Sequence, residues 1–449
     1  MSDAASKPAK MPPKMNGAAE AAELRDYAFL GFLVCINIMN FIDRQLLASF
    51  ANFVVPDLGL SNTQFGLLTG FAFIVFYSVM GIFMGALADR LHRPRLLAAG
   101  LALWSLLTAA SGRATNFVSL LVPRMLIGVG ESVATPTSIS MLADRFPPRQ
   151  MGFAAGIYYM GVPAGVALSL LIAGYLGPTI GWRNCFYLLG GIGIGFALVL
   201  LLIPETTRRG VALTAEGRIE TRPLREMVGL LWRALRLSPA LSATIAGGVV
   251  VHFALGAAAF DQLWFVQERG FERADIAVRS GWIAAVGGVL GTFFGGISSD
   301  WWQTRFQSGR PMFLAVTLTL LLPFNFAYRI FPGDHILFWV GLFFAFIQLG
   351  MFYGPTFATV QDLAPARVRA TAIAFYILLL NMVGLGVGIT FGGIAIDYLI
   401  AAEVAEPYTK TLLAFTILSS FAIPLLYIGG KYYHRDKAQL SGLLGEKDA

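Results

Sequence analysis

The sequence predicts an all-α membrane protein with twelve transmembrane helices in two pseudo-symmetric six-helix bundles. Three observations lead to this fold class. Hydrophobic residues make up 56% of the 449 residues and charged residues only 13%, which leaves too little polar surface for a soluble protein of this size. The apolar residues are gathered in twelve blocks, each able to cross the hydrocarbon core with about 20 residues. The two halves of the chain also carry similar short motifs at corresponding positions.

Each apolar block is interpreted as one transmembrane helix, because the connections are mostly too short to cover an apolar helix as a soluble core would. The first six blocks should form an N-terminal bundle over residues 26–204, and the last six a C-terminal bundle over residues 240–432. The blocks cover residues 27–55, 63–88, 95–112, 117–142, 151–176, 184–203, 240–266, 280–299, 311–331, 335–360, 371–399 and 408–430.

The segments outside the bundles are polar. Residues 1–25 contain no hydrophobic centre of the kind that a secretory signal requires, so we expect a disordered tail there, and residues 433–449 should form a second tail. Residues 205–239 read as a linker between the halves. Within it, "PLREMVGLLWRALRL" predicts an amphipathic helix on the membrane surface; a merely solvated linker helix is the alternative. Its apolar face would carry Leu224, Met227, Val228, Leu231 and Leu235.

The positive charge of the chain indicates its orientation. Most of the 33 Lys and Arg residues fall in the two tails and in the even-numbered connections, and positive residues stay on the cytoplasmic side. Both termini are therefore predicted to be cytoplasmic. The net charge of +7 is explained by this topology and needs no nucleic-acid partner. The chain has no N-x-[ST] glycosylation acceptor, which fits a multi-pass protein of a bacterial inner membrane.

Several classes of function find no support in the sequence. Cys35 and Cys185 fall in apolar helices and the four histidines are scattered, so neither a disulfide framework nor a metal site is expected. The absence of a G-x-x-x-x-G-K-[ST] loop argues against nucleotide hydrolysis. A membrane enzyme or a receptor on the same scaffold remains an alternative, but no nucleophile paired with a base is visible. We therefore expect no catalytic residue and no cofactor.

Internal duplication points to transport. "DRFPPR" (Asp144 to Arg149) and "DLAPAR" (Asp362 to Arg367) share the spacing D-x-x-P-x-R, and each follows the fourth block of its half. "GALADRLHRPR" after the second block has a degraded counterpart, "GGISSDWWQTR", after the eighth, with Asp300 at its centre. Duplicated halves in a twelve-helix membrane protein are typical of transporters that bind cargo between two bundles.

The segment "GIFMGALADRLHRPR", Gly81 to Arg95, closely resembles the G-x-x-x-D-R-x-x-R-[RK] signature of the major facilitator superfamily. The resemblance implies that family's fold and a cytoplasmic clasp between helices that opens during transport; the alternative is that the arginines only set the topology. Gly81 and Gly85 are spaced for close helix approach. The predicted cytoplasmic gate comprises Gly81, Gly85, Asp89, Arg90, Arg93, Asp144, Arg149, Asp300, Asp362 and Arg367.

A narrower resemblance is carried by N-x-x-D-R in the first block, "LSNTQFGLLTGFAFIVFY" after it, and "RMLIGVGE" in the fourth block. These runs resemble the spinster family of sphingolipid and lysophospholipid transporters. The resemblance implies a monomeric transporter that moves a lipid-like anion through its membrane by alternating access. Organic-anion and sugar-acid transporters of the same superfamily share parts of these patterns, so a proton symporter of a small organic anion is the alternative.

Four charged residues, Asp43, Arg44, Arg124 and Glu131, fall inside the first and fourth predicted membrane helices. Each costs roughly 2.5 to 3.5 kcal/mol at the bilayer centre, so each needs a partner or a wet cavity. Helical spacing places two sets of polar residues on one face each of the first and fourth helices. These sets are Asn37, Asn40 and Arg44, and Arg124, Gly128, Glu131, Thr135 and Ser138.

We expect Arg124 and Arg44 to alternate between pairing with the carboxylates and binding an anionic substrate head. Protonation of Asp43 or Glu131 would release Arg124 and bias the conformational equilibrium, so these three residues are the predicted proton-coupling groups. The predicted polar substrate-binding residues are Arg44, Arg124, Asn40 and Thr135. The alternative is a permanent ion-pair network that only fixes helix packing. Function is favoured because buried pairs seldom stabilise a fold and the block at 335–360 has no charge at the matching depth.

The second half supplies a predicted apolar wall that would suit a hydrocarbon tail, although ordinary packing or lipid contact explains any single aromatic residue equally well. The residues of this wall that we predict to bind substrate are Phe260, Trp264, Tyr353 and Phe375. His252, Asp261, Gln348, Asn381 and Asp397 are secondary candidates.

Overall fold

The computed structural model describes residues 22–88, 90–205, 224–306, 308–365 and 368–445. Within these residues twelve helical spans are long and apolar enough to cross a membrane, which confirms the predicted fold class and number of spans. The first half contains α1 (Leu24–Ser49), α2 (Ala51–Leu58), α3 (Asn62–Thr69), α4 (Phe71–Ala88), α5 (Arg93–Ser111), α6 (Phe117–Glu131), α7 (Ala134–Arg145), α8 (Pro148–Tyr159), α9 (Gly161–Tyr175) and α10 (Gly177–Leu201).

The second half follows the same plan after a connecting helix, α11 (Leu224–Leu237). A 3₁₀ turn, η1 (Ala258–Phe260), joins α12 to α13, and a π-helical segment, η3 (Leu380–Gly386), joins α17 to α18. The helices of this half are α12 (Pro239–Ala257), α13 (Asp261–Gln267), α14 (Arg273–Phe306), α15 (Arg310–Ile330), α16 (Ile336–Leu363), α17 (Arg369–Leu379), α18 (Val387–Ala401), α19 (Pro407–Ser420) and α20 (Ala422–Gly445).

Local sequence signals fix where several spans begin. Ser61 starts α3 with a capping box, in which its hydroxyl accepts from the Gln64 amide N–H and the Gln64 side chain accepts from the Ser61 N–H. Asn116 and Ser119 form the same arrangement at the start of α6. Many helices run past the predicted apolar blocks, because their polar ends need no lipid contact. The eighth span, for example, is Arg273–Phe306, whereas the predicted block covers residues 280–299.

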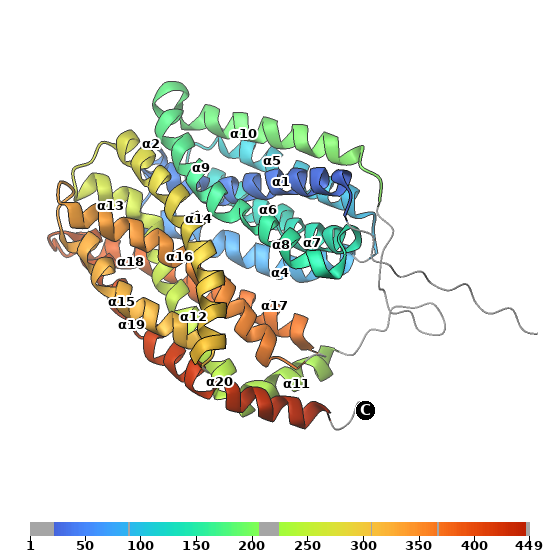
Figure 1. Ribbon diagram of the computed structural model, residues 1–449. Coiled ribbons are helices and arrows are strands. Elements are labelled where there is room, and N and C mark those ends of the chain that lie inside the picture. The colour runs from blue at the N-terminus through green and yellow to red at the C-terminus, as the bar shows by residue number, and fades with distance from the viewer. Residues whose placement is uncertain (1–21, 89, 206–223, 307, 366–367, 446–449) are drawn as a thin grey trace, which may run out of the picture.

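All spans run between two ends of the molecule. We call the end where α1 begins and α20 ends the terminal end, and the other the distal end. In Figure 1 the two bundles lie close together on the left, the distal end, and diverge toward the right, where α4 and α8 of the first half stand apart from α17 and α11 of the second. The helix α11 lies at the terminal end, where Leu231 and Ala234 are buried in a cluster with Tyr376 and Tyr433.

Two seams join the halves near the distal end, and both depend on glycines. In the first seam α3 and α4 meet α18: a Cβ on Gly66 would lie 2.9 Å from the Ile389 carbonyl oxygen, and one on Gly393 would lie 2.3 Å from that of Asn62. In the second seam α9 meets α14, and a Cβ on Gly174 would lie 2.5 Å from Val278 Cγ2. Only glycine permits such close backbone approach.

Farther along the same spans the contact ends. A Cβ on Gly81, Gly85, Gly152 or Gly156 would meet no atom within 4 Å among the described residues. The close helix approach predicted for Gly81 and Gly85 is therefore absent in this conformation, because the bundles have already separated at that level. The structure is closed at the distal end and parted at the terminal end.

Candidate functional site

The buried charges of the first half lie where α1 meets α6. Arg44 donates from Nε to Glu131 Oε2 at 3.0 Å. The Glu131 side chain is fully buried, whereas 23% of the Arg44 side chain is exposed. The helix α6 ends at Glu131 itself, and α7 begins at Ala134. Glu131 is thus the sequestered partner of a guanidinium that can still reach other ligands.

Aromatic rings hold the Arg44 guanidinium in place. Its Cζ lies 4.2 Å from the ring centroid of Tyr77 and 5.0 and 5.3 Å from those of Phe41 and Phe73. Rings at these distances attract a cation without using its hydrogen-bond donors. Arg44 therefore keeps donors available for an anion.

Arg124 is placed differently from the prediction. Its guanidinium donates to three backbone carbonyls, those of Arg44 (2.7 Å), Asp43 (3.1 Å) and Leu68 (3.4 Å), rather than to a carboxylate side chain. The residue is 4% exposed. The spacing of the sequence correctly placed Arg124 near the carboxylates. It could not show that backbone carbonyl oxygens would accept the hydrogen bonds of this guanidinium. In this conformation Arg44, and not Arg124, forms the ion pair with Glu131.

Asp43 points into the first bundle. It is 2% exposed, and neither carboxylate oxygen has a hydrogen-bond partner among the described residues. Trp104 and Thr108 of α5 lie next to it, and their polar atoms also lack partners with hydrogen-bond geometry. Through space Asp43 meets both the like charge of Glu131 and the opposite charge of Arg124. A buried carboxylate without a well-placed donor is costly when ionised.

The two remaining polar predictions lie close by. Asn40 is completely buried beside Glu131, with both side-chain polar atoms lacking a partner of good geometry in the described part of the chain. Thr135 is half-buried at the start of α7, beside the Tyr158 hydroxyl. Asn37, on the same face of α1, donates to the Tyr158 carbonyl at 2.7 Å.

Of the four predicted aromatic residues, only Tyr353 lies opposite the charges. Its hydroxyl is 3.1 Å from His252 Nε2 and lies within electrostatic range of Arg44 across the interface between the halves. Phe260 packs edge-on against Phe65 in a cluster of buried apolar residues near the distal end, which we call the distal cluster. Trp264 is fully buried in the distal cluster. Phe375 packs near the terminal end, in the cluster that contains Tyr376 and Leu231. These three are not part of the central site in this conformation.

The distal end is held shut by hydrogen bonds between the halves. Asp397 on α18 accepts from the backbone N–H of Asn62 (3.0 Å), the Asn62 side chain (2.9 Å) and the N–H of Thr63 (2.7 Å). Tyr408 donates to the Asn62 side-chain oxygen at 2.7 Å, and Asn52 donates to the Gln262 carbonyl at 2.6 Å. Asp397 thus acts as a cap on α3 that is supplied by the other half.

The other secondary candidates have local roles. Asp261 accepts from Arg329 at 2.6 Å near the distal end, and Gln348 accepts from Asn325 at 2.6 Å. Asn381 lies in the π-helical segment η3.

At the terminal end the predicted gate residues form two separate clusters. In the first half Arg93 is 2% exposed and contacts Asp144 at 2.6 Å, Glu205 at 2.8 Å and the Ser140 hydroxyl at 2.9 Å. Arg90 and Arg149 are exposed. Asp89 and Arg367 lie outside the described residues.

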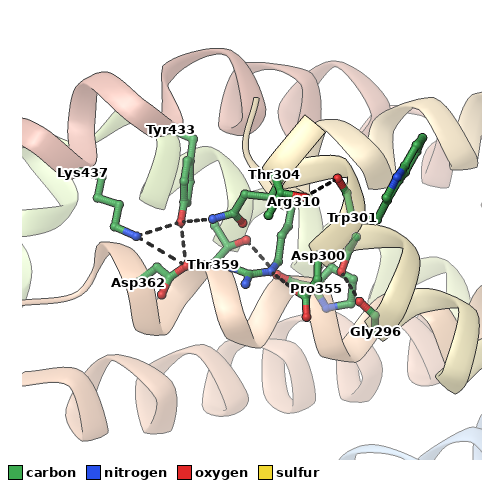
Figure 2. A network of polar contacts seen from close by, with 12 residues as sticks. Gly296, Asp300, Trp301, Thr304, Arg310, Pro355, Thr359, Asp362, Tyr433 and Lys437 are labelled. Atoms are coloured by element: carbon green, nitrogen blue, oxygen red, sulfur yellow. Dashed lines mark hydrogen bonds and ion pairs between the residues drawn. The ribbon is translucent and has the colours of Figure 1, made fainter. Parts of the chain in front are cut away.

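Figure 2 shows the corresponding cluster of the second half. Arg310 donates to Asp300 at 2.8 Å and to Asp362 at 2.7 Å, and Asp362 also accepts from Tyr433 at 2.6 Å. Arg310 and Glu205 are not among the residues predicted from the sequence. The signal for Arg310 is an Arg-Pro pair that begins both α5 and α15. The hydrogen bonds between described residues of different halves lie at the distal end, so these two clusters do not meet.

Known transporters resemble this chain over part or most of its length. The MFS-type efflux pump of Mycolicibacterium smegmatis is 27% identical over 417 residues, which cover 92% of this chain and 94% of that protein. Protein spinster of Drosophila melanogaster is 26% identical over 78% of this chain and 59% of its own length. The hexuronate transporter of Bacillus subtilis is 33% identical, but over only 41% of this chain and 45% of its own.

Solved structures show the same fold. A bacterial homolog to the human lysosomal transporter spinster, in an inward-facing and unoccupied conformation, superposes with a TM-score of 0.78 at 24% identity and covers 93% of this chain and 99% of that one. Its inward-facing and occupied form gives 0.75 at 25% identity, with 92% and 98% covered. The sequence model described as Major Facilitator Superfamily matches residues 33–389. The chain therefore belongs to the major facilitator superfamily of membrane transporters, as its signature segment predicted.

Proposed function

We propose that the protein is a proton-coupled, alternating-access transporter of an amphiphilic anion, of the sphingolipid or lysophospholipid class. The observation that carries this proposal is the asymmetry at Arg44. On one side the partly exposed guanidinium offers donors to an anion. On the other lie Tyr353, His252 and apolar rings, without a carboxylate among the described residues there. An anionic head and a hydrocarbon tail match these two surfaces.

The two seams support alternating access. Because the contacts between the halves end before Gly81 and Gly156, the conformation opens toward the terminal end. With both termini in the cytoplasm of a bacterial inner membrane, as positive-charge placement favours, this is an inward-facing state. Transport then requires the distal hydrogen bonds to break and the open glycine surfaces to close against the second half.

Proton coupling would use the carboxylates as follows. An anionic head that approaches Arg44 competes with Glu131 for the guanidinium. A buried Glu131 that loses its partner is stabilised by taking up a proton. Asp43, whose oxygens accept no hydrogen bond from the described residues, supplies a second proton site within the same bundle. Arg124 then serves to hold α1, α3 and α6 together while the proton moves.

The substrate class can be tested by thermal unfolding of the purified protein with three ligands. These are a long-chain lysophosphatidylethanolamine, its deacylated headgroup glycerophosphoethanolamine, and a hexuronate. Ligands that bind the folded state raise the unfolding temperature. The proposal expects stabilisation by the lysolipid alone. Stabilisation by the hexuronate alone would instead favour a symporter of small organic anions, the reading that the partial match to the hexuronate transporter suggests.

Flux completes the test, because binding alone would also fit a receptor. Proteoliposomes with an imposed pH gradient should move the stabilising ligand, and reversal of the gradient should change the net direction. The direction of physiological transport follows from the same assay; the efflux pump of Mycolicibacterium smegmatis makes export the first expectation. The protein is expected to act as a monomer in surrounding lipid.

A further inference from the structure

We propose that His252 is a positioning residue that turns the hydroxyl of Tyr353 into a hydrogen-bond acceptor toward the substrate. The second half would then select headgroups that carry an N–H or O–H donor. This inference rests on the proposed function and adds a specificity rule to it.

The geometry of His252 fixes which of its nitrogens carries the proton. Nδ1 lies 3.0 Å from the carbonyl oxygen of Gly248, one turn earlier on α12. A carbonyl can only accept, so Nδ1 must carry the hydrogen. His252 is 2% exposed and packs against the ring of Phe352 and the backbone of Gly384, and no carboxylate contacts it among the described residues. The ring is therefore a neutral Nδ1–H tautomer.

The other ring nitrogen then determines the polarity of Tyr353. In this tautomer Nε2 carries a lone pair, so the Tyr353 hydroxyl 3.1 Å away must donate to it. The hydroxyl hydrogen is therefore donated to His252 inside the second bundle. Toward the interface Tyr353 can offer only the lone pairs of its oxygen. Its ring is held by stacking on Phe357, with centroids 6.2 Å apart, which limits reorientation of the hydroxyl.

Arg44 and Tyr353 can contact one headgroup in complementary ways, one as donor and the other as acceptor. Arg44 offers donors only, Tyr353 offers an acceptor, and the two lie within electrostatic range across the interface. A headgroup with a phosphate and an ammonium satisfies both residues at once, whereas a headgroup with no donor leaves the Tyr353 oxygen unmatched. Loss of a hydrogen bond to a charged group weakens binding about tenfold or more.

The test compares lysophosphatidylethanolamine and lysophosphatidylcholine with the same acyl chain. Both are zwitterions, but only the ethanolamine nitrogen carries N–H donors. We expect the wild type to prefer the ethanolamine lipid about tenfold in competitive uptake. Tyr353→Phe and His252→Phe should each bring this ratio near one, whatever the total uptake, because the acceptor that distinguishes the two headgroups is then lost or no longer oriented. Tyr376→Phe is the matched control, because its buried hydroxyl makes no hydrogen bond to His252 or Tyr353, and the ratio should stay at the wild-type value.

A second measurement is independent of any substrate. With histidine labelled by ¹⁵N, nuclear magnetic resonance distinguishes the two neutral tautomers and the charged ring, and the chain has only four histidines. The His252 signal is identified as the one that the wild type shows and His252→Phe lacks. It should be that of a ring with a hydrogen on Nδ1 and none on Nε2. An Nε2–H tautomer, or equal wild-type uptake of the two lipids, overturns the inference alone. Absence of uptake for both lipids overturns the proposed function.

Discussion

Replacement of Asp397 by Asn should shift the transporter toward an outward-open state. Asp397 accepts three hydrogen bonds at the start of α3, and they join the two halves only while the distal end is closed. Asn keeps the size of the side chain but has one acceptor oxygen instead of two, and its NH₂ group would point at a backbone N–H. The variant therefore removes charge and acceptors from this one contact without creating a cavity.

The size of the effect follows from the number of bonds lost. Hydrogen bonds to a charged group contribute about 1.5 to 3 kcal/mol each after exchange with water. An Asn that retains part of the network should cost the closed distal end about 2 kcal/mol. That changes the ratio of the two conformations by about 30-fold, enough to populate a state that the wild type rarely visits.

Distances between spin labels at residues 95 and 305 would report this shift. Arg95 and Arg305 are exposed at the terminal end of different halves, so the distance shortens when that end closes. The native Cys35 and Cys185 would first be replaced. The control is Asp57→Asn, because Asp57 lies at the same end but pairs with Arg183 within the first half. If Asp397→Asn leaves the distance distribution unchanged, or if the control shifts it equally, the gating role assigned to Asp397 is refuted.

Three further variants separate the roles of residues in the first half. Arg44→Lys keeps the charge but loses the guanidinium fork, so uptake should fall about tenfold at an unchanged unfolding temperature; a fall in stability with normal uptake would contradict its assignment to binding. Arg124→Lys cannot hold three carbonyls at once, so it should lower the unfolding free energy by about 2 kcal/mol, which chemical denaturation measures; unaltered stability would count against its anchoring role. Gly81→Leu places a side chain in the closing path, so flux should stop while ligand binding persists in an equilibrium assay; Gly191→Leu, also in open space on α10, should transport normally.

The parts of the site that sequence reasoning reached are those with a strong energetic signature. Ionisable residues stand out within apolar blocks because lipid repels them, and so Asp43, Arg44 and Glu131 could be identified from the sequence. Helical spacing was enough to place Arg44 and Glu131 on one polar face each of α1 and α6, and the structure brings these two residues together. The structure bears out the twelve spans for the same reason: a long apolar run has few alternatives.

The remaining features depend on contacts that no sequence pattern predicts. The donors of Arg124 go to carbonyl oxygens, which every residue possesses. The N–H donors that Asp397 accepts from belong to a helix start more than three hundred residues earlier in the chain, and no local pattern connects the two. The surroundings of Gly81 change with the conformation, so spacing alone could not say whether a neighbour is present. Phe260 and Trp264 are aromatic residues near the distal end, where packing and substrate contact look alike in sequence.

The most direct test of the account measures proton-coupled flux in proteoliposomes that hold wild type, Asp43→Asn or Glu131→Gln. An imposed pH gradient should drive uptake of a lysolipid by the wild type against its concentration gradient. Each variant should still exchange the lipid at equal concentrations but should no longer respond to pH, because the neutral amide cannot gain or lose the coupled proton. If both variants retain wild-type acceleration by the pH gradient, the buried carboxylates are packing elements and the central claim is contradicted.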